Sequence, residues 1–103
     1  MARELVWTAG ATADLLQLYE QVGDHDLAIK VLRQPLDHAL SLLNENPALG
    51  PRVRGTLHIR RLLVGPKFRF GVFYVEEPRG ILIHALLDMR QSSDVIRRRL
   101  GSL

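Results

Sequence analysis

Arginine is the residue whose type and spacing most directly suggest chemistry in this chain. From Arg52 onward there are eleven basic residues, ten of them arginine, against four acidic ones, a balance of +7. The preceding residues carry three basic and seven acidic side chains, a balance of −4. Because the guanidinium group is planar and always charged, it suits phosphate and carboxylate ligands. The second half is therefore expected to meet nucleic acid or an acidic protein segment, unless its cations form only a solvated surface.

Three arginines are candidates for a phosphate clamp. Arg61 and Arg69 fall on neighbouring expected strands, and Arg90 directly follows the last one. Guanidinium groups that converge from separate strands can hold a phosphodiester and stabilise the charge of its transition state. His84 is the only nearby side chain that ordinarily titrates near neutrality. If the chain acts on a phosphodiester, Arg61, Arg69, Arg90 and His84 are thus the candidate catalytic residues.

Other chemistries find little support in the sequence. The chain has no cysteine, and its four histidines are scattered without metal-ligand spacing. No glycine-rich phosphate loop and no nucleophile elbow occurs. We therefore expect no metal and no cofactor. The apolar runs are short and the N-terminus lacks a secretory pattern, which predicts a cytoplasmic protein with no membrane partner.

The elements that must position these residues follow from periodicity. A strand over 4–7 leads into a helix capped by Thr8, and a second helix begins near Asp24 or Asp26 and ends at Asn46-Pro47, with a kink expected at Pro35. Strands are expected over 58–64, 68–75 and 81–89, followed by a short helix capped by Ser92 or Ser93. The order β-α-α-β-β-β-α predicts an α+β fold, in which a helical hairpin covers one face of an antiparallel sheet. The length of 103 residues suits a single domain over 1–103.

The last two strands have a register that can be argued from their apolar faces. Phe68, Phe70, Val72 and Tyr74 are expected to face the helices, with Arg69 opposite Asp88 and Phe73 opposite His84. The other face then carries Arg69, His84, Asp88 and Arg90 around Gly71. This second face is expected to be open and functional. A structural ion pair between Arg69 and Asp88 is the alternative for that arginine.

The chain resembles the RelE/ParE superfamily of bacterial toxins from type II toxin–antitoxin pairs. The matching pieces run in order along nearly the whole chain: Thr8 with Ala13-Asp14-Leu15 and Tyr19, Asn46-Pro47-Ala48-Leu49-Gly50, Ile59-Arg60-Arg61-Leu62, Phe68-Arg69-Phe70 with Tyr74, and Asp88-Met89-Arg90-Gln91. The resemblance implies a toxin neutralised by a cognate antitoxin, with the helical hairpin on an antiparallel sheet.

The superfamily divides by target. RelE-like members cut mRNA in the ribosome, and Arg61, Arg69 and Arg90 fall near the positions of their catalytic cations. The resemblance thus implies that these three arginines, with His84 as the base, are catalytic only if the protein is a ribonuclease. Ile96 stands approximately where those members carry a tyrosine, and Asp88 where many ParE-like members carry histidine. The Pro47-Ala48-Leu49-Gly50 ending of the second helix is more ParE-like, which favours a poison of DNA gyrase. A ribosome-dependent mRNA endonuclease is the alternative, and a non-toxic interaction module of the same fold is a second one.

The antitoxin is expected to contribute an acidic, amphipathic segment that folds on the open face of the sheet. A protein partner is also expected to contact the last helix, although three cations at a helix C-terminus are favoured by the helix dipole without any ligand. The candidate partner-binding residues are Arg60, Phe73, Asp88, Arg97, Arg98 and Arg99.

Overall fold

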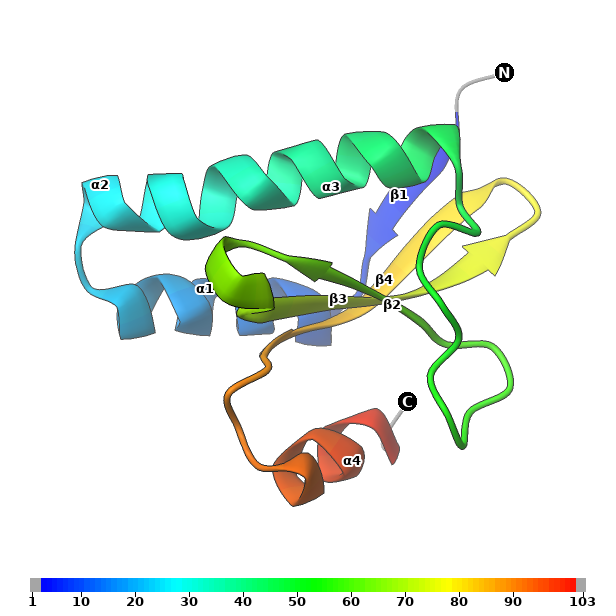
Figure 1. Cartoon of the computed structure of the whole chain (residues 1–103). Coiled ribbons are helices and arrows are strands. Elements are labelled where there is room, and N and C mark those ends of the chain that lie inside the picture. The colour runs from blue at the N-terminus through cyan, green and yellow to red at the C-terminus, as the bar shows by residue number, and fades with distance from the viewer. Residues whose placement is uncertain (1–2, 102–103) are drawn as a thin grey trace.

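A mixed four-stranded sheet with helices on both sides makes up the fold (Figure 1). The structure is a computed structural model, and it describes residues 3–101. In chain order the elements are β1 (Glu4–Trp7), α1 (Ala9–Val22), α2 (His25–Ala28), the π-helical turn η1 (Ile29–Arg33), α3 (Gln34–Glu45), β2 (Arg60–Val64), the 3-10 turn η2 (Pro66–Phe68), β3 (Phe70–Glu77), β4 (Gly80–Asp88) and α4 (Ser93–Gly101). The sequence predicted this α+β order, and it is confirmed.

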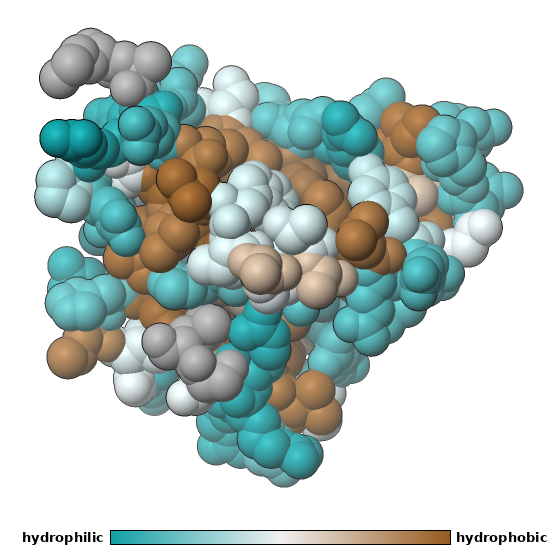
Figure 2. All heavy atoms as spheres, turned by 180° about the vertical axis from the view of Figure 1, so that it is seen from behind, coloured by the Kyte–Doolittle hydropathy of each residue, from teal (hydrophilic) through white to brown (hydrophobic). Residues whose placement is uncertain are grey.

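The strands lie in the order β1-β4-β3-β2. β2, β3 and β4 form the expected antiparallel meander. β1 pairs in parallel with β4, and α1 follows β1 directly, so that the hairpin of helices lies over one face of the sheet. β1 is an exposed edge, with Leu5 40% and Val6 48% accessible. The view from behind shows apolar side chains gathered in this region of the surface (Figure 2).

Short polar side chains begin the helices, as their positions in the sequence predicted. The Thr8 hydroxyl accepts a hydrogen bond from the Ala11 amide (3.0 Å), and the Asp24 carboxylate accepts one from Leu27 (2.8 Å). Ser92 accepts one from Val95 (3.3 Å) at the start of α4. Each cap satisfies an amide that the first turn of the helix leaves unpaired.

Pro35 is accommodated without a break between α2 and α3. It has no N–H to donate to the turn before it, and the π-helical turn η1 directly precedes α3. The Gln34 amide donates to the Ile29 carbonyl across this wider turn. The helix therefore continues as one ribbon from α2 to α3 (Figure 1).

The main core lies between the hairpin and the sheet. From the sheet side, Phe70, Val72 and Tyr74 are fully buried, which confirms that these alternating residues of β3 face the helices. Leu32, Leu36 and Leu43 of the helical hairpin contribute equally buried side chains. Phe70 in particular has no exposed surface, so the assignment of this face to the core is correct.

Phe68 does not belong to that core, contrary to the sequence prediction. It ends η2, where both Lys67 and Phe68 have a φ of 55°, and its side chain is 65% exposed. The Gly65-Pro66 turn extends through Phe68, so β3 begins only at Phe70. The strand is thus shorter at this end than its aromatic pattern indicated.

The expected register between β3 and β4 is also wrong, because β4 contains a bulge. Phe70 lies opposite Asp88 and Phe73 opposite Ala85, but Tyr74 lies opposite Ile83, which leaves His84 without a partner in β3. One extra residue reverses the side of the sheet to which later side chains point. Ile83 and Leu86 therefore both enter the main core.

The second face of the sheet is not open, and this expectation is wrong as well. Phe73, Ala85 and Leu87 form a second apolar cluster, which Leu100 and Ile96 of α4 cover. Val53 and Ile59 pack against its side. Figure 1 shows α4 on the opposite side of the sheet from α3. A side chain at Gly71 would meet the sulfur of Met89 at 2.7 Å, so this glycine is used for packing rather than for a ligand.

We predict that Leu43→Ala lowers the free energy of unfolding by about 2–5 kcal/mol, because Leu43 is completely buried in the main core. Urea denaturation measures the change. Leu16→Ala is the matched control, since Leu16 is 61% exposed and its loss is expected to cost less than about 0.5 kcal/mol. Equal effects of the two substitutions would contradict the assignment of this core.

Candidate functional site

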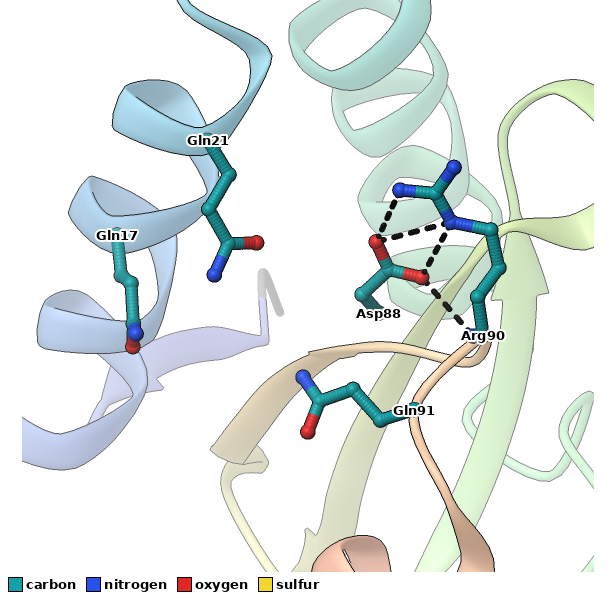
Figure 3. Close-up of a pocket in the computed structure, with 5 residues that line it drawn as sticks. All are labelled: Gln17, Gln21, Asp88, Arg90 and Gln91. Carbon is teal, nitrogen blue, oxygen red and sulfur yellow. Dashed lines mark hydrogen bonds and ion pairs between the residues drawn. The ribbon is translucent and has the colours of Figure 1, made fainter.

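The arginines of interest meet at Asp88, at the end of β4. Arg90 holds both carboxylate oxygens, with Nη2 2.9 Å from Oδ2 and Nε 3.1 Å from Oδ1, and its backbone amide donates to Oδ1 at 2.9 Å. Arg69 reaches the same carboxylate from the residue before β3, with Nε 3.3 Å from Oδ2. The Asp88 side chain is 6% exposed. Figure 3 shows the Arg90 side chain against this carboxylate. The ion pair that the sequence offered as the alternative for Arg69 is thus present.

The bulge in β4 brings this cluster to the helix side of the sheet. Asp88 follows Leu86 at strand spacing and lies opposite Phe70, and both of these neighbours belong to the main core. The guanidinium of Arg69 also stacks over the Phe70 ring at 4.9 Å. Arg69 is therefore held by one carboxylate and one aromatic ring.

Two opposing effects act on the Asp88 carboxyl. Burial raises the pKa of Asp88, but the hydrogen bonds from Arg90 and Arg69 outweigh this effect and hold the pKa below its ordinary value of 3.8. The same hydrogen bond raises the pKa of Arg90. All three groups are charged at neutral pH, so one carboxylate offsets one of the two cations and leaves a formal charge of +1.

A wide, open depression of about 520 Å³ lies beside the cluster. Its walls are Gln17 and Gln21 of α1, together with Asp88, Arg90 and Gln91. Figure 3 shows the Gln21 and Gln91 amides extending into the space between α1 and the end of β4. The Arg90 side chain is 65% exposed on this depression. The site offers one partly neutralised cation and three neutral amides to a ligand.

Of the four candidate catalytic residues, only Arg69 and Arg90 come together. Arg61 of β2 lies opposite Phe73, whose side chain is on the α4 side of the sheet, whereas Asp88 is on the helix side. His84 is the bulge residue of β4 and does not line the depression. The three-arginine clamp with a nearby base is thus not assembled in this structure.

The candidate partner-binding residues are also dispersed. Arg60 pairs with Glu76 at 3.0 Å and donates to the carbonyls of Ala48 and Gly50 at 3.3 and 2.8 Å. Phe73 is only 1% exposed under α4. Both residues therefore stabilise the fold, and any role in binding a partner stays a prediction.

The arginines of α4 divide into inward and outward ones. Arg97 is exposed and forms an ion pair with Asp94 of the same helix. Arg98 is also exposed. Arg99 points inward, where its Nη2 lies 2.9 Å from Asp14 Oδ2 and 3.3 Å from the His84 carbonyl. It thus ties α4 to α1 and to the bulge, and the role of Arg97, Arg98 and Arg99 in binding a partner stays a prediction.

Asp14 is a key residue that the site prediction did not single out. Its Oδ2 accepts hydrogen bonds from Arg99 and, at 3.1 Å, from the backbone amide of Leu86 just after the bulge. A Cβ at Gly10, one turn earlier on α1, would lie 2.8 Å from the Arg99 guanidinium. A glycine one turn before an aspartate, on the same face of a helix, is the sequence signal for this binding position of the Arg99 guanidinium.

Tyr74 fixes the segment after α3. Its hydroxyl donates to the Pro47 carbonyl at 2.7 Å and accepts from the Gly50 amide at 2.9 Å. Burial raises the pKa of Tyr74, and the hydrogen bond from Gly50 and the nearby Arg60 only partly offset this. The Pro47-Ala48-Leu49-Gly50 motif therefore has a structural anchor in the core.

Within residues 3–101, no group of three or more acidic or histidine side chains is arranged to hold a metal ion. No helix in this part of the chain is long and apolar enough to span a bilayer.

We predict that Asp88→Asn lowers stability at neutral pH, because Arg69 and Arg90 lose their counter-charge. The pKa of Asp88 is depressed in the folded state, so its contribution is complete above the ordinary value of 3.8 and is lost as the pH falls through the folded value. The difference between wild type and variant, measured by urea denaturation across this range, is expected to shrink below pH 3.8. Glu77→Gln, at an exposed position of the β3–β4 hairpin, is the control. A difference that grows on acidification would contradict the assignment.

We predict that Asp14→Ala loosens α4. The substitution removes the acceptor of the Leu86 amide and one of the acceptors of Arg99, which is expected to cost about 1–3 kcal/mol. Hydrogen exchange measured by mass spectrometry is expected to show faster exchange in α4 than in α3. Asp26→Ala, at an exposed position of α2, is the control. Unchanged exchange in α4 would show that the apolar contacts of Leu100 suffice.

Comparisons with known proteins support the fold. No family model matches the chain, and no curated protein sequence is significantly similar to it. Among solved structures, a chain of the "Chromosomal ParDE TA system from P. aeruginosa" superimposes with a TM-score of 0.60 and 19% sequence identity, covering 84% of this chain and 96% of that one. The protein therefore has the fold of a ParDE toxin–antitoxin component, as its resemblance to the RelE/ParE superfamily implied.

Proposed function

We propose that this protein is the toxin of a type II toxin–antitoxin pair. It acts in the cytoplasm, where it arrests cell growth by poisoning DNA gyrase, and a cognate antitoxin neutralises it. Two independent findings support the toxin class. The motifs that resemble the RelE/ParE superfamily run in order along the chain, and the fold is that of a chain in the ParDE structure from P. aeruginosa. A single domain over residues 1–103 carries the activity in this proposal.

The choice of gyrase rests on the Asp88 cluster. RNA cleavage needs cations that are ready to receive a phosphate, a base for the 2′-hydroxyl and an acid for the leaving oxygen. Here Arg69 and Arg90 already bind Asp88, and Arg61 lies on the other side of the sheet. A toxin that acts by binding a protein needs none of these groups, so the arrangement favours the gyrase poison.

One observation favours mRNA cleavage as a second candidate. The Arg90 side chain is 65% exposed and lines an open depression, and Arg69 forms an ion pair with the same Asp88 carboxylate as Arg90 does. A phosphate entering from this side would compete with Asp88 for both guanidinium groups. The ribonuclease would then require Asp88 to release them.

The experiment that separates the two candidates is induction of the protein in a bacterial host, with growth, translation and the DNA damage response followed separately. We predict growth arrest with an induced DNA damage response and with translation intact at the onset of arrest. Toxicity is expected to survive His84→Gln and to respond to changes at exposed residues of α4 such as Val95 and Arg98. His84→Gln is the matched test of chemistry, because a ribonuclease using this base would slow by about 10²–10⁴-fold.

The contrary outcomes are distinct. Ribosome-dependent cuts in mRNA that disappear in Arg69→Ala and Arg90→Ala, while the variants remain folded by circular dichroism, would establish the ribonuclease. Normal growth on induction of a folded, abundant protein would support the non-toxic interaction module instead.

A further inference from the structure

The outer edge of β1 has backbone groups without partners. β1 is an end strand of the sheet and pairs, in parallel, with β4. The Glu4 and Thr8 amides donate to carbonyls on the side of β4, at 2.9 and 3.1 Å. Because alternate residues of a strand direct their backbone groups to the same edge, those of Leu5 and Trp7 point away from the sheet. Among residues 3–101, the Leu5 and Trp7 amides and carbonyls have no hydrogen-bond partner on this outer edge.

Apolar side chains flank this edge on both sides of the sheet. Leu5 is 40% and Val6 48% exposed, and they lie on opposite sides because neighbours in a strand alternate. Val6 lies beside Leu82 of β4, and neither belongs to the apolar cluster that α4 covers. Figure 2 shows apolar side chains gathered over this part of the surface.

β1 also lacks the features that usually protect an edge strand. Such strands commonly carry a lysine, a proline or a bulge, which prevents pairing with another chain. The charged residue of β1 is Glu4, at the start of the strand, and the three residues after it are apolar. The edge is therefore open to a further strand.

Symmetry fixes the register in which a second copy of β1 fits this edge. If the two strands pair antiparallel around a two-fold axis at Val6, Leu5 of each copy lies opposite Trp7 of the other. These are the residues whose amides and carbonyls point outward, so about four hydrogen bonds form between the copies. Val6 then lies directly opposite Val6 of the second copy, at a pair without hydrogen bonds, where side chains are closest. The two valines join the Leu82 side chains of both copies into one apolar row.

Charge complementarity favours the same antiparallel orientation. It places Glu4 of each copy opposite Thr8, the N-cap of α1, in the other copy. The first turn of α1 contains no acidic residue, so an anion is favourable at this positive end of the helix dipole. Arg99, which also binds Asp14, lies next to this turn, since a Cβ at Gly10 would meet its guanidinium at 2.8 Å. Parallel pairing would instead bring the two Glu4 carboxylates together.

We propose that the edge of β1 binds a second copy of this chain, so that the two β1 strands pair antiparallel around Val6 and the two sheets become one. A four-residue strand offers less than the about 800 Å² per partner that a stable interface buries. The dimer is therefore expected to be weak, with a dissociation constant on the order of 10–100 μM. The contact uses neither the Asp88 cluster nor the exposed side of α4, so it is independent of the proposed function.

The first test places a single cysteine at the axis of the dimer in the full chain. The natural sequence has no cysteine, so Val6→Cys supplies one thiol per chain. The two Cα atoms at this pair are expected to lie about 4.5 Å apart, which a disulfide spans. At about 100 μM protein, we expect the oxidant diamide to convert most of the Val6→Cys chain to a covalent dimer.

Two other single cysteines are the matched controls. Leu5→Cys lies on the same strand, but its two Cα atoms would be more than about 7 Å apart in the dimer, beyond the reach of a disulfide. Leu16→Cys lies on α1, at a position that is 61% exposed and far from the proposed axis in sequence. Both are expected to form covalent dimers at least about tenfold more slowly than Val6→Cys. Equal rates for the three variants, or a faster rate for Leu5→Cys, would overturn the proposal.

The second test measures the affinity of the unmodified chain by sedimentation equilibrium. Val6→Lys sets two like charges opposite each other at an exposed position, and it is expected to raise the dissociation constant by about tenfold or more. Glu4→Gln removes the charge that faces α1 of the other copy, and it is expected to raise the dissociation constant about two- to fivefold at low salt. Leu16→Lys is the control with unchanged association.

Two results of this second test would contradict the dimer. One is a chain that stays monomeric at every concentration up to about 500 μM, well above the expected dissociation constant. The other is self-association that Val6→Lys does not weaken while circular dichroism shows the variant to be folded.

Discussion

The extra residue in β4 at His84 decides which side of the sheet each later residue faces. Before it, Ile81 and Ile83 point to the helical hairpin; after it, Leu86 does so. Ala85 and Leu87 consequently face α4 and build the second apolar cluster. Asp88 is placed on the helix side, where Arg69 and Arg90 bind it. Two apolar layers and the ion-pair cluster thus depend on one irregularity in one strand.

The bulge is itself stabilised by polar contacts from three side chains. The Thr8 hydroxyl donates a hydrogen bond to the His84 carbonyl at 3.2 Å, and the Asp14 carboxylate accepts one from the amide of Leu86, two residues after His84. Arg99 of α4 then binds both Asp14 and the His84 carbonyl. Because β1 pairs with β4 only as far as Ile83, the backbone beyond that point lacks a strand neighbour on this edge. These side chains instead supply the hydrogen bonds that the backbone groups of this part of β4 need.

The helices and the helix side of β3 could be predicted from the sequence because their apolar residues recur with one period and their caps are short polar residues. The bulge could not. From Ile81 to Leu87 nearly every residue of β4 is apolar, so both faces are compatible with a core and no alternation reveals a shift of one position. Phe68 was misplaced for a related reason, since aromatic alternation continues into a turn.

The sequence predicted which residue types make up the candidate site, but not how these residues are arranged. Clustered arginines predict a positive surface, and the pair of Arg69 with Asp88 was an open alternative. Which cations are neutralised depends on contacts between distant residues, such as Arg99 with Asp14, that no local spacing encodes. The structure leaves Arg61 half-buried, in a stretch of sequence from Pro51 to Val75 without acidic residues.

The central claim is that Asp88 retains Arg69 and Arg90 when the protein meets nucleic acid. Carbon-detected NMR of the Asp88 carboxyl, titrated with and without a single-stranded RNA oligonucleotide, tests it directly. We expect a pKa below the ordinary 3.8 that the RNA does not change. A pKa that rises in the presence of RNA would mean that phosphate displaces Asp88 from the arginines, which would contradict the account.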